Sequence, residues 1–343
     1  MRLLVTGTDG YIGCRLAPML MAAGHTVTGL DTGYYRDGWL YSTRETRQTP
    51  MTLNMDLRDI APSDLAGYDA VVHLAELSND PLGENNPGVT EKINYEGSVQ
   101  LAHAARTAGV RRFVYASSCS IYGQASTEWV DETSTPNPQT AYARCKALVE
   151  RSVRPMASPE FCVTFLRNAT AYGASPRIRF DIVLNDLCAL AWTGKRIAMV
   201  SDGTPWRPIV HIEDICQAIL CALAAPAERV NGEILNVGAD EENYRIRDLA
   251  QIVAETFEGC TVSTGASSGD RRSYRVSFQR IRERLPEFQP RWTARRGAEE
   301  LRDLFQRIDL SKDTYEFRAF TRLKQLNYLK RTAQVDEDLR WRY

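Results

Sequence analysis

The sequence predicts an α/β fold in which a doubly wound parallel sheet lies between layers of helices. Apolar runs of strand length alternate with amphipathic helical patterns through the first half of the chain, as in parallel strands joined by crossover helices. A glycine-rich turn at residues 6–13 also separates the first strand from the first helix. Both features are typical of a sheet whose strand ends form one binding edge.

The expected elements follow in a regular order. Strands are expected at 2–6, 26–31, 51–56, 70–75, 112–118 and 162–167. Helices are expected at 11–23, 89–108 and 141–153. Beyond residue 170 the alternation loosens, and strands at 208–212 and 233–238 are expected to return to the sheet.

This order divides the chain into three parts. Residues 1–170 are expected to form a Rossmann-type nucleotide-binding domain, which also receives strands near 208–240. Residues 171–310 are expected to form a smaller, discontinuous α/β lobe that binds substrate. Residues 311–343 form a tail whose apolar spacing suits a helix packed on the body.

The overall composition excludes several classes of protein. With 42 basic and 43 acidic residues there is no basic field for nucleic acid. No apolar run approaches the roughly 18 residues of a membrane helix, so we expect no membrane contact and a cytoplasmic protein. The eight cysteines form no CxxC pair, so we expect free thiols and no metal site.

The segment TGTDGYIG at 6–13 predicts a dinucleotide site. Gly7, Gly10 and Gly13 lie between a strand and a helix, where missing side chains let a diphosphate approach the backbone and the helix amino terminus. Asp31 ends the next strand, where a carboxylate can accept hydrogen bonds from the adenosine ribose. Because the same carboxylate repels a 2′-phosphate, the cofactor is expected to be NAD rather than NADP.

Other strand ends supply further candidate contacts to NAD. Asp56 could receive the adenine amino group, and 73–76 would lie along the dinucleotide, with His73 a strand-end histidine rather than a catalyst. The residues expected around the cofactor are Gly7, Gly10, Tyr11, Ile12, Gly13, Asp31, Asp56, Leu57, Leu74, Ala75, Glu76, Asn94, Tyr142 and Lys146.

Tyr142 and Lys146, four residues apart on an expected helix, share one face. An ammonium near a phenol favours the phenolate, so Tyr142 is a candidate general base. Ser118, at the end of the strand 112–118, could hydrogen-bond the same substrate hydroxyl. The three residues predict oxidation of a carbinol by the dinucleotide.

The segments TGTDGYIG, ASSCSIYG at 116–123 and YARCK at 142–146, in this order and spacing, resemble the extended short-chain dehydrogenases/reductases. The likeness is to their NAD-dependent sugar-nucleotide epimerase/dehydratase branch and runs from residue 1 to about 280. It implies tightly held NAD, a catalytic set of Ser118, Tyr142 and Lys146, a nucleotide-diphosphate sugar as substrate, and a homodimer in which helices 89–108 and 141–153 pair.

The resemblance also implies substrate contacts. Asn185 matches the family's amide beside the diphosphate, Arg207 its arginine near the nucleotide, and Arg272 its diphosphate clamp, for which Arg271 is an equal candidate. Thr170 stands where relatives commonly have asparagine. Asn79, Ser118, Ser120, Thr170, Asn185, Arg207 and Arg272 complete the expected substrate set.

Two positions narrow the reaction that the resemblance implies. Relatives that eliminate water carry Asp and Glu directly after the catalytic residue, and decarboxylating relatives carry the glutamate; here these positions are Cys119 and Ser120. Dehydration to a 4-keto-6-deoxy sugar is therefore disfavoured, and epimerisation at C4 is the leading expectation.

Alternatives remain open. Relatives that epimerise beside the ketone carry a cysteine two residues after the serine, so Cys119 is kept as a candidate catalytic residue of a 3- or 5-epimerase, although the offset of one residue favours a core position. Glu76, Asn79 and Asp80 could border the sugar and supply an acid or base. A dehydrogenase or ketoreductase that exchanges NAD with solution is the other alternative.

Overall fold

The computed structural model describes residues 1–44, 48–266 and 272–342. Seven parallel strands form the main sheet in the order β11-β7-β5-β4-β1-β2-β3. They are β1 (Arg2–Thr6), β2 (Thr26–Asp31), β3 (Met51–Asn54), β4 (Ala70–His73), β5 (Arg112–Ser118), β7 (Cys162–Asn168) and β11 (Glu233–Val237). This sheet confirms the Rossmann-type α/β fold.

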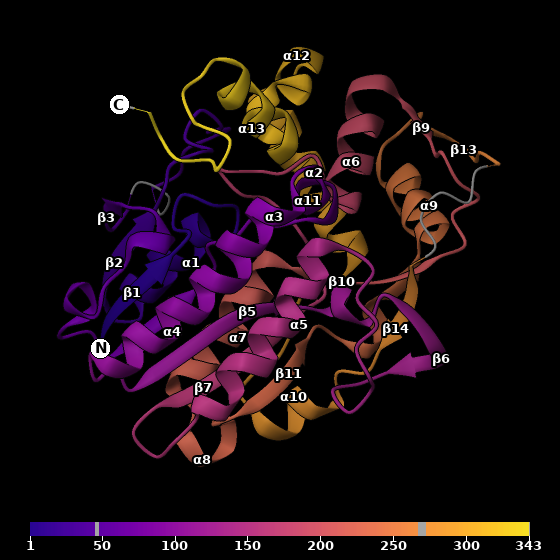
Figure 1. The fold of residues 1–343 in the computed structure, drawn as a ribbon. Helices are drawn as coiled ribbons and strands as arrows, with labels where there is room; N and C mark the ends of the chain where they lie inside the picture. The colour runs from indigo at the N-terminus through magenta and orange to yellow at the C-terminus, as the bar shows by residue number, and fades with distance from the viewer. Residues whose placement is uncertain (45–47, 267–271, 343) are drawn as a thin grey trace.

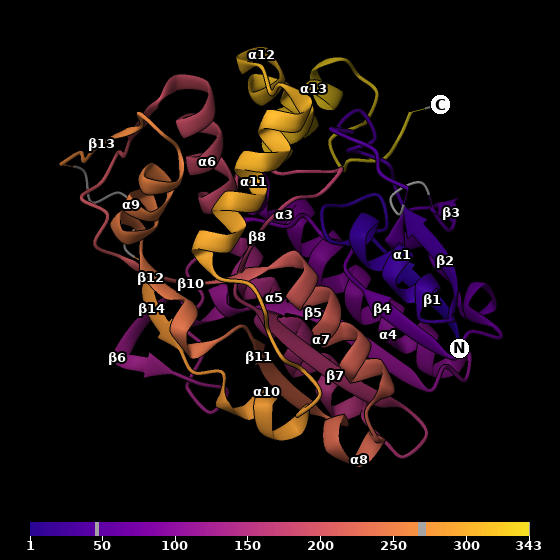
Figure 2. The ribbon, with the colours of Figure 1, turned by 180° about the vertical axis from the view of Figure 1, so that it is seen from behind.

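Helices cover both faces of the sheet. On one face lie α4 (Ser98–Thr107) and α5 (Ala141–Val153), which share an apolar cluster with β5 and β7 (Figure 1). On the other face lie α1 (Gly13–Ala22) and α7 (Ile212–Ala224) (Figure 2). The segment expected as one helix at 89–108 consists of α3 (Pro87–Thr90), a π-helical stretch Glu91–Gly97 and α4.

Smaller sheets and helices form the second lobe beyond the carboxyl ends of the strands. The small sheets are β12-β10-β8, β13-β9 and β14-β6. Their strands are β6 (Gln124–Val130), β8 (Thr170–Tyr172), β9 (Arg196–Ala198), β10 (Trp206–His211), β12 (Asn243–Arg245), β13 (Thr261–Ser263) and β14 (Ser273–Val276). The helices of this lobe are α6 (Val183–Gly194), α9 (Ile246–Thr256) and α11 (Ala294–Ile308). Two short helices, α8 (Ala227–Val230) and α10 (Gln279–Arg284), pack instead against β7 and β11 of the main sheet (Figure 1).

Of the two strands expected to return to the main sheet, one does so. β11 pairs in parallel with β7 at the edge of the main sheet. β10, by contrast, pairs with β8 and β12 in a separate sheet, which corrects the expectation for 208–212. The reason is β8, a short strand directly after β7, which offers β10 a partner outside the main sheet.

The C-terminal tail is broken rather than one helix. It contains α12 (Lys312–Glu316), a 3₁₀ turn Arg318–Phe320 and α13 (Arg322–Arg331). Leu326 and Leu329 of α13 pack with Leu82 of α2 (Asp80–Asn85) in a shared apolar cluster. The chain, yellow in Figure 1, then returns toward β2, where the Trp341 indole nitrogen donates to the carbonyl of Thr32 at 2.7 Å.

Candidate active site

A cavity of about 510 Å³ opens at the carboxyl ends of the main-sheet strands, between the two lobes. Most of the residues predicted from the sequence line it. They are Gly7, Gly10, Tyr11, Ile12, Gly13, Asp31, Asp56, Leu57, Leu74, Ala75, Glu76, Asn79, Ser118, Ser120, Tyr142, Lys146, Thr170, Arg207 and Arg272. Parallel strand ends thus bring residues from distant parts of the sequence to one edge.

The glycine loop leaves no room for side chains. Gly7 has φ +80°, and a Cβ there would lie 3.0 Å from the backbone nitrogen of Ala75. A Cβ on Gly13 would lie 2.0 Å from the carbonyl oxygen of Gly7, where no atom fits. Glycine at both positions therefore lets α1 begin directly over the loop and aim its amino terminus at the cavity.

Asp31 has the geometry of a ribose acceptor. Its carboxylate accepts hydrogen bonds from the backbone nitrogens of Gly33 at 2.7 Å and Asp9 at 3.0 Å, which fix its orientation at the cavity wall. Burial, and then the negative charge of Asp9, raise the pKa of Asp31 to about 6. The group is therefore ionised at neutral pH but titrates just below it.

Asp56 lines the cavity and also caps a turn. Its side chain accepts from the backbone nitrogen of Arg58 and forms ion pairs with Arg58 at 2.6 Å and Arg340 at 3.3 Å. Although burial opposes the charge, these partners lower the pKa of Asp56. The C-terminal tail thus reaches the end of the cavity expected for adenine.

Ser118, Tyr142 and Lys146 meet in the middle of the cavity wall. Thr140 caps α5 by accepting from the backbone nitrogen of Ala143 at 3.2 Å, which places Tyr142 in the first turn. The Lys146 ammonium lies 5.5 Å from the centre of the Tyr142 ring. The predicted set is therefore assembled on β5 and α5.

The charge around Tyr142 differs from the expectation of a favoured phenolate. Burial raises the pKa of Tyr142, the carboxylates of Glu76 and Asp80 raise it further, and a hydrogen bond with Ser118 lowers it. Since the Lys146 ammonium is engaged by Glu76, its charge does not dominate at the phenol.

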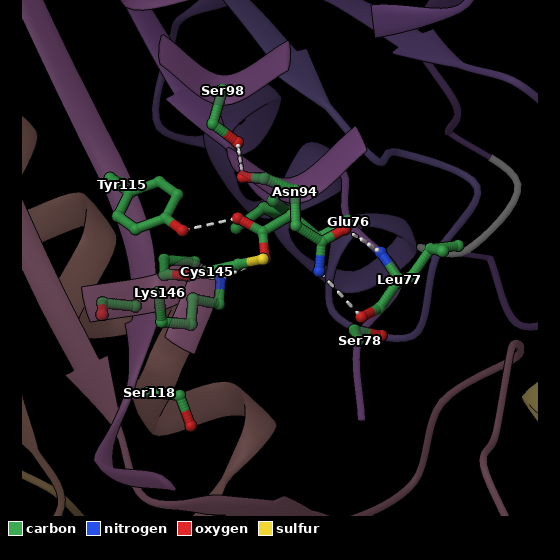
Figure 3. Close-up of polar contacts among 12 residues, drawn as sticks. Glu76, Leu77, Ser78, Asn94, Ser98, Tyr115, Ser118, Cys145 and Lys146 are labelled. Atoms are coloured by element: carbon green, nitrogen blue, oxygen red, sulfur yellow. Dashed lines mark hydrogen bonds and ion pairs between the residues drawn. The ribbon is translucent and has the colours of Figure 1, made fainter. Parts of the chain in front are cut away.

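Glu76 lies beside Lys146 in the wall of the cavity (Figure 3). One carboxylate oxygen is 2.8 Å from the Lys146 ammonium, and the other accepts from the Tyr115 hydroxyl at 2.5 Å. The ammonium also donates to the carbonyl of Ala116 and lies 4.5 Å from the centre of the Tyr115 ring. Burial raises the pKa of Glu76, while Lys146 acts against this shift.

Three predicted residues lie outside the cavity, which corrects their assignment. The Cys119 thiol is buried and contacts the carbonyl of Arg167 at 3.1 Å, so the one-residue offset turns it into the core. Asn94 uses its amide to bind both backbone groups of Leu77, at 2.8 and 3.1 Å (Figure 3). It therefore holds the loop after β4 in place.

Asn185 is the third predicted residue that lies outside the cavity. Its oxygen accepts from the backbone nitrogen of Gly173 at 3.0 Å, and its nitrogen donates to the Tyr11 hydroxyl and the carbonyl of Arg179. These bonds satisfy a fully buried amide, so Asn185 ties α6 to the loops that shape the cavity. His73, as expected, is a satisfied strand-end residue bonded to Thr6 and Ser98.

Of the predicted substrate residues, Arg207 and Arg272 lie on the wall formed by the second lobe, whereas Asn79 follows β4 of the main sheet. The Arg207 guanidinium donates to the carbonyl of Arg272, and Arg272 forms an ion pair with Asp80. Asn79 caps α2 by accepting from Leu82 at 2.9 Å and donates to Asp181 at 2.8 Å. The alternative candidate Arg271 lies outside the described residues.

Sequence reasoning missed other residues that line the cavity. Tyr35 follows Asp31 by four residues, Arg179 lies in the loop after β8, and Arg322 begins α13. The alternating arginines of SPRIRF at 175–180 were a usable signal. Nothing in the tail distinguished Arg322 from its charged neighbours, because its place depends on how the tail folds back.

The cavity also contains residues with unpaired polar atoms. Within the described parts of the chain, the buried side-chain oxygens of Tyr35, Ser120 and Asn168 have no hydrogen-bond partner, and all three residues line this cavity. Buried polar atoms without partners are uncommon in folded proteins. With the glycine loop and Asp31, they fit a site completed by a dinucleotide and a polar substrate.

Residues 1–44, 48–266 and 272–342 contain neither a membrane-spanning helix nor a metal-binding cluster. In those ranges no helix has both the length and the apolar character to cross a membrane. The same ranges hold no group of three or more His, Cys, Asp or Glu side chains arranged to bind a metal ion.

Comparison with known proteins gives the same picture. The model of the NAD dependent epimerase/dehydratase family matches residues 3–238. A UDP-glucose 4-epimerase of Mycolicibacterium smegmatis is 30% identical over 265 residues, covering 74% of this chain and 82% of its own. A UDP-N-acetyl-alpha-D-glucosaminuronate decarboxylase of Bacillus cytotoxicus is 28% identical over 259 residues, covering 73% and 78%.

A solved structure agrees over a longer stretch. MoeE5, in complex with UDP-glucuronic acid and NAD, has a TM-score of 0.76 and 26% identity, covering 90% of this chain and all of MoeE5. The resemblance drawn from the sequence motifs is thereby confirmed, and with it NAD as the cofactor. The chain belongs to the NAD-dependent epimerase/dehydratase family.

Proposed function

We propose that the protein is an epimerase that inverts C4 of a nucleotide-diphosphate sugar through a transient keto sugar. The observation that carries this proposal is the set Ser118, Tyr142 and Lys146 on the cavity wall, with no carboxylic acid at positions 119 and 120. Such a site can move one proton at a carbinol but lacks the adjacent acid pair expected of a dehydratase.

Bound NAD supplies the oxidant for the first half of this reaction and, as NADH, the reductant for the second. Ser118 hydrogen-bonds the reacting hydroxyl, and Tyr142 accepts its proton and later returns it. Gly7, Gly10 and Gly13 with Asp31 hold the diphosphate and ribose of the cofactor. The keto sugar must turn in the site between the two halves, so that its other face meets the cofactor.

Arg207 and Arg272 support a nucleotide-diphosphate sugar as the substrate. Both line the cavity on the wall of the second lobe, opposite the cofactor strands, and guanidinium groups suit phosphate oxygens. The relatives named UDP-glucose 4-epimerase and the MoeE5 complex with UDP-glucuronic acid make UDP sugars the first substrates to test.

The experiment is incubation with UDP-glucose and UDP-glucuronic acid in D₂O, with the recovered sugar read by NMR. A 4-epimer without ring deuterium is expected, because no proton of the carbon skeleton exchanges with solvent. Deuterium beside C4 would instead identify a 3- or 5-epimerase. A 4-keto-6-deoxy sugar, loss of CO₂ or net NADH would identify a dehydratase, a decarboxylase or a dehydrogenase.

We also propose a homodimer through the helices at 89–108 and 141–153, as the family resemblance implies, and a cytoplasmic location. All eight cysteines are free thiols, which suits a reducing compartment. Recovery of the protein from a cell fraction other than the cytosol would contradict the location.

A further inference from the structure

Arg322, the first residue of α13, is a buried cation in the cavity wall. Its exposed fraction is 2%, and it lines the same cavity as the glycine loop. It lies beyond residues 3–238, the part of the chain that matches the family model. A contact made by this residue therefore belongs to the tail and not to the shared family domain.

Within residues 1–44, 48–266 and 272–342, the Arg322 guanidinium has no acidic partner of its own. Among the residues described, no carboxylate forms an ion pair with it and no oxygen accepts a hydrogen bond from it; its contact is with the Tyr35 ring, at 4.0 Å from the ring centre. Burial, and then the charge of Arg179, lower the pKa of Arg322 to about 10. The group still carries its charge at neutral pH.

The nearby carboxylate of Asp181 is already engaged. It forms ion pairs with Arg179 at 2.9 Å and accepts from Asn79 at 2.8 Å and from the backbone nitrogen of Arg322 at 3.2 Å. Two buried guanidinium groups, Arg179 and Arg322, therefore lie near one carboxylate, and Asp181 forms its ion pair with Arg179. A buried excess of positive charge is costly unless an anion joins it.

Strand order places the two arginines relative to the glycine loop. Arg322 contacts Tyr35 in the loop after β2, and Arg179 donates to the carbonyl and hydroxyl of Ser78, at 2.8 and 3.1 Å, in the loop after β4. In the sheet β1 lies between β4 and β2. The two arginines therefore contact the loops on either side of the glycine loop that follows β1.

We propose that Arg322 and Arg179 bind the diphosphate of NAD from the side opposite the amino terminus of α1. The diphosphate then lies between the glycine loop and two guanidinium groups, and the tail becomes part of the cofactor site. This proposal depends on NAD as the family cofactor and not on the reaction proposed above. The other diphosphate in reach is that of the sugar nucleotide, whose expected contacts, Arg207 and Arg272, lie on the wall of the second lobe.

The test compares full-length Arg322→Gln with Arg331→Gln, which removes an exposed arginine from the last turn of the same helix. Calorimetry measures binding of NAD, ADP-ribose, adenosine and UDP. Loss of a charged contact is expected to weaken NAD and ADP-ribose by about 10- to 100-fold and to leave adenosine unchanged. Arg331→Gln should bind all four as the unmodified protein does.

Other results overturn the proposal. Unchanged NAD affinity with weakened UDP would assign the arginine to the sugar nucleotide, and equal loss for adenosine would indicate a general disturbance of the site. If Arg322→Gln does not fold, hydrogen exchange in the unmodified protein decides. ADP-ribose, but not adenosine, is expected to protect the backbone of α13, and equal protection by both would contradict the diphosphate contact.

Discussion

Glu76 places a negative charge beside Lys146 and Tyr142, two residues of the proposed catalytic set. It pairs with the Lys146 ammonium at 2.8 Å, and after burial it is the largest contribution to the raised pKa of Tyr142. Tyr142 accepts a proton only as the phenolate, so a raised pKa confines oxidation to higher pH.

We therefore predict that Glu76→Gln moves the acid limb of the pH profile of kcat/KM to lower pH. Removing the carboxylate removes a charge that opposes the phenolate, and glutamine keeps a hydrogen-bond acceptor for Tyr115. The rising limb is compared up to about pH 11, because the ordinary tyrosine pKa is about 10 and that of Tyr142 is raised above it. An unchanged limb would show that Glu76 does not act on Tyr142.

Substitutions of Tyr142 and Cys119 are predicted to have opposite effects on kcat. Tyr142→Phe should lower kcat by about 10² to 10⁴, the usual effect of losing a general acid/base, and leave NAD binding nearly intact. Cys119→Ala should leave kcat close to its original value, because the thiol contacts a carbonyl in the core. Steady-state kinetics and NAD titration check both, and a large loss in Cys119→Ala would reopen the 3- or 5-epimerase reading.

We predict that NAD affinity depends on pH through the ionisation of Asp31. Its pKa, raised to about 6, means that the carboxylate gains a proton as pH falls through 6 and loses an acceptor for the ribose. NAD affinity should therefore decline below pH 6, and NADP should bind more weakly than NAD at pH 7. Titrations at several pH values test this, and Asp31→Asn should remove most of the decline.

The positions of residues in the cavity were predictable from sequence where they depend on local spacing. The glycines, Asp31, Ser118, Tyr142 and Lys146 belong to short motifs attached to strand ends, and all line the cavity. Asn94, Cys119 and Asn185 were misassigned because their side chains are engaged by backbone groups of distant segments. Such partners are set by the tertiary fold and leave no local pattern.

At the scale of elements, the start of α1 depends on one missing side chain. We predict that Gly13→Ala weakens NAD binding and destabilises the protein by several kcal/mol, because the new Cβ would lie 2.0 Å from a carbonyl oxygen and force the loop apart. The control is Gly194→Ala at the end of α6, where nothing lies within 4 Å of an added Cβ. It should be neutral or slightly stabilising in thermal unfolding.

Comparison with the Gly194→Ala control also shows which result would contradict the prediction for Gly13→Ala. If Gly13→Ala and Gly194→Ala had the same melting temperature and NAD affinity, the close packing of the glycine loop would not be essential.

Elements outside this loop were less predictable from the sequence. β10 reads as an apolar strand like those of the main sheet, and only the presence of β8 decides which sheet it joins.

At the scale of the whole molecule, we predict a homodimer. The proposed interface is formed by 89–108 and 141–153, whose helices α4 and α5 cover one face of the sheet (Figure 1). Sedimentation at micromolar concentration should give twice the chain mass of 38.6 kDa. A monomer at that concentration would exclude the dimer.

The fold class was predictable because strand and helix periodicities extend over half the chain. The path of the tail was not, because its contacts join residues far apart in sequence. Tyr34 donates to the carbonyl of Leu339, and Arg340 pairs with Asp59, 281 positions away. The position of the tail is therefore set by contacts that exist only once the rest of the chain has folded.

This closing segment has a consequence for the time at which the protein acquires its cofactor. A ribosome makes the glycine loop and Asp31 long before it adds Arg340 and Trp341. Because these later residues contact Asp56 and Thr32 at the rim of the proposed cofactor site, that site is complete only after they have been added. A nascent chain that lacks them would therefore hold NAD loosely.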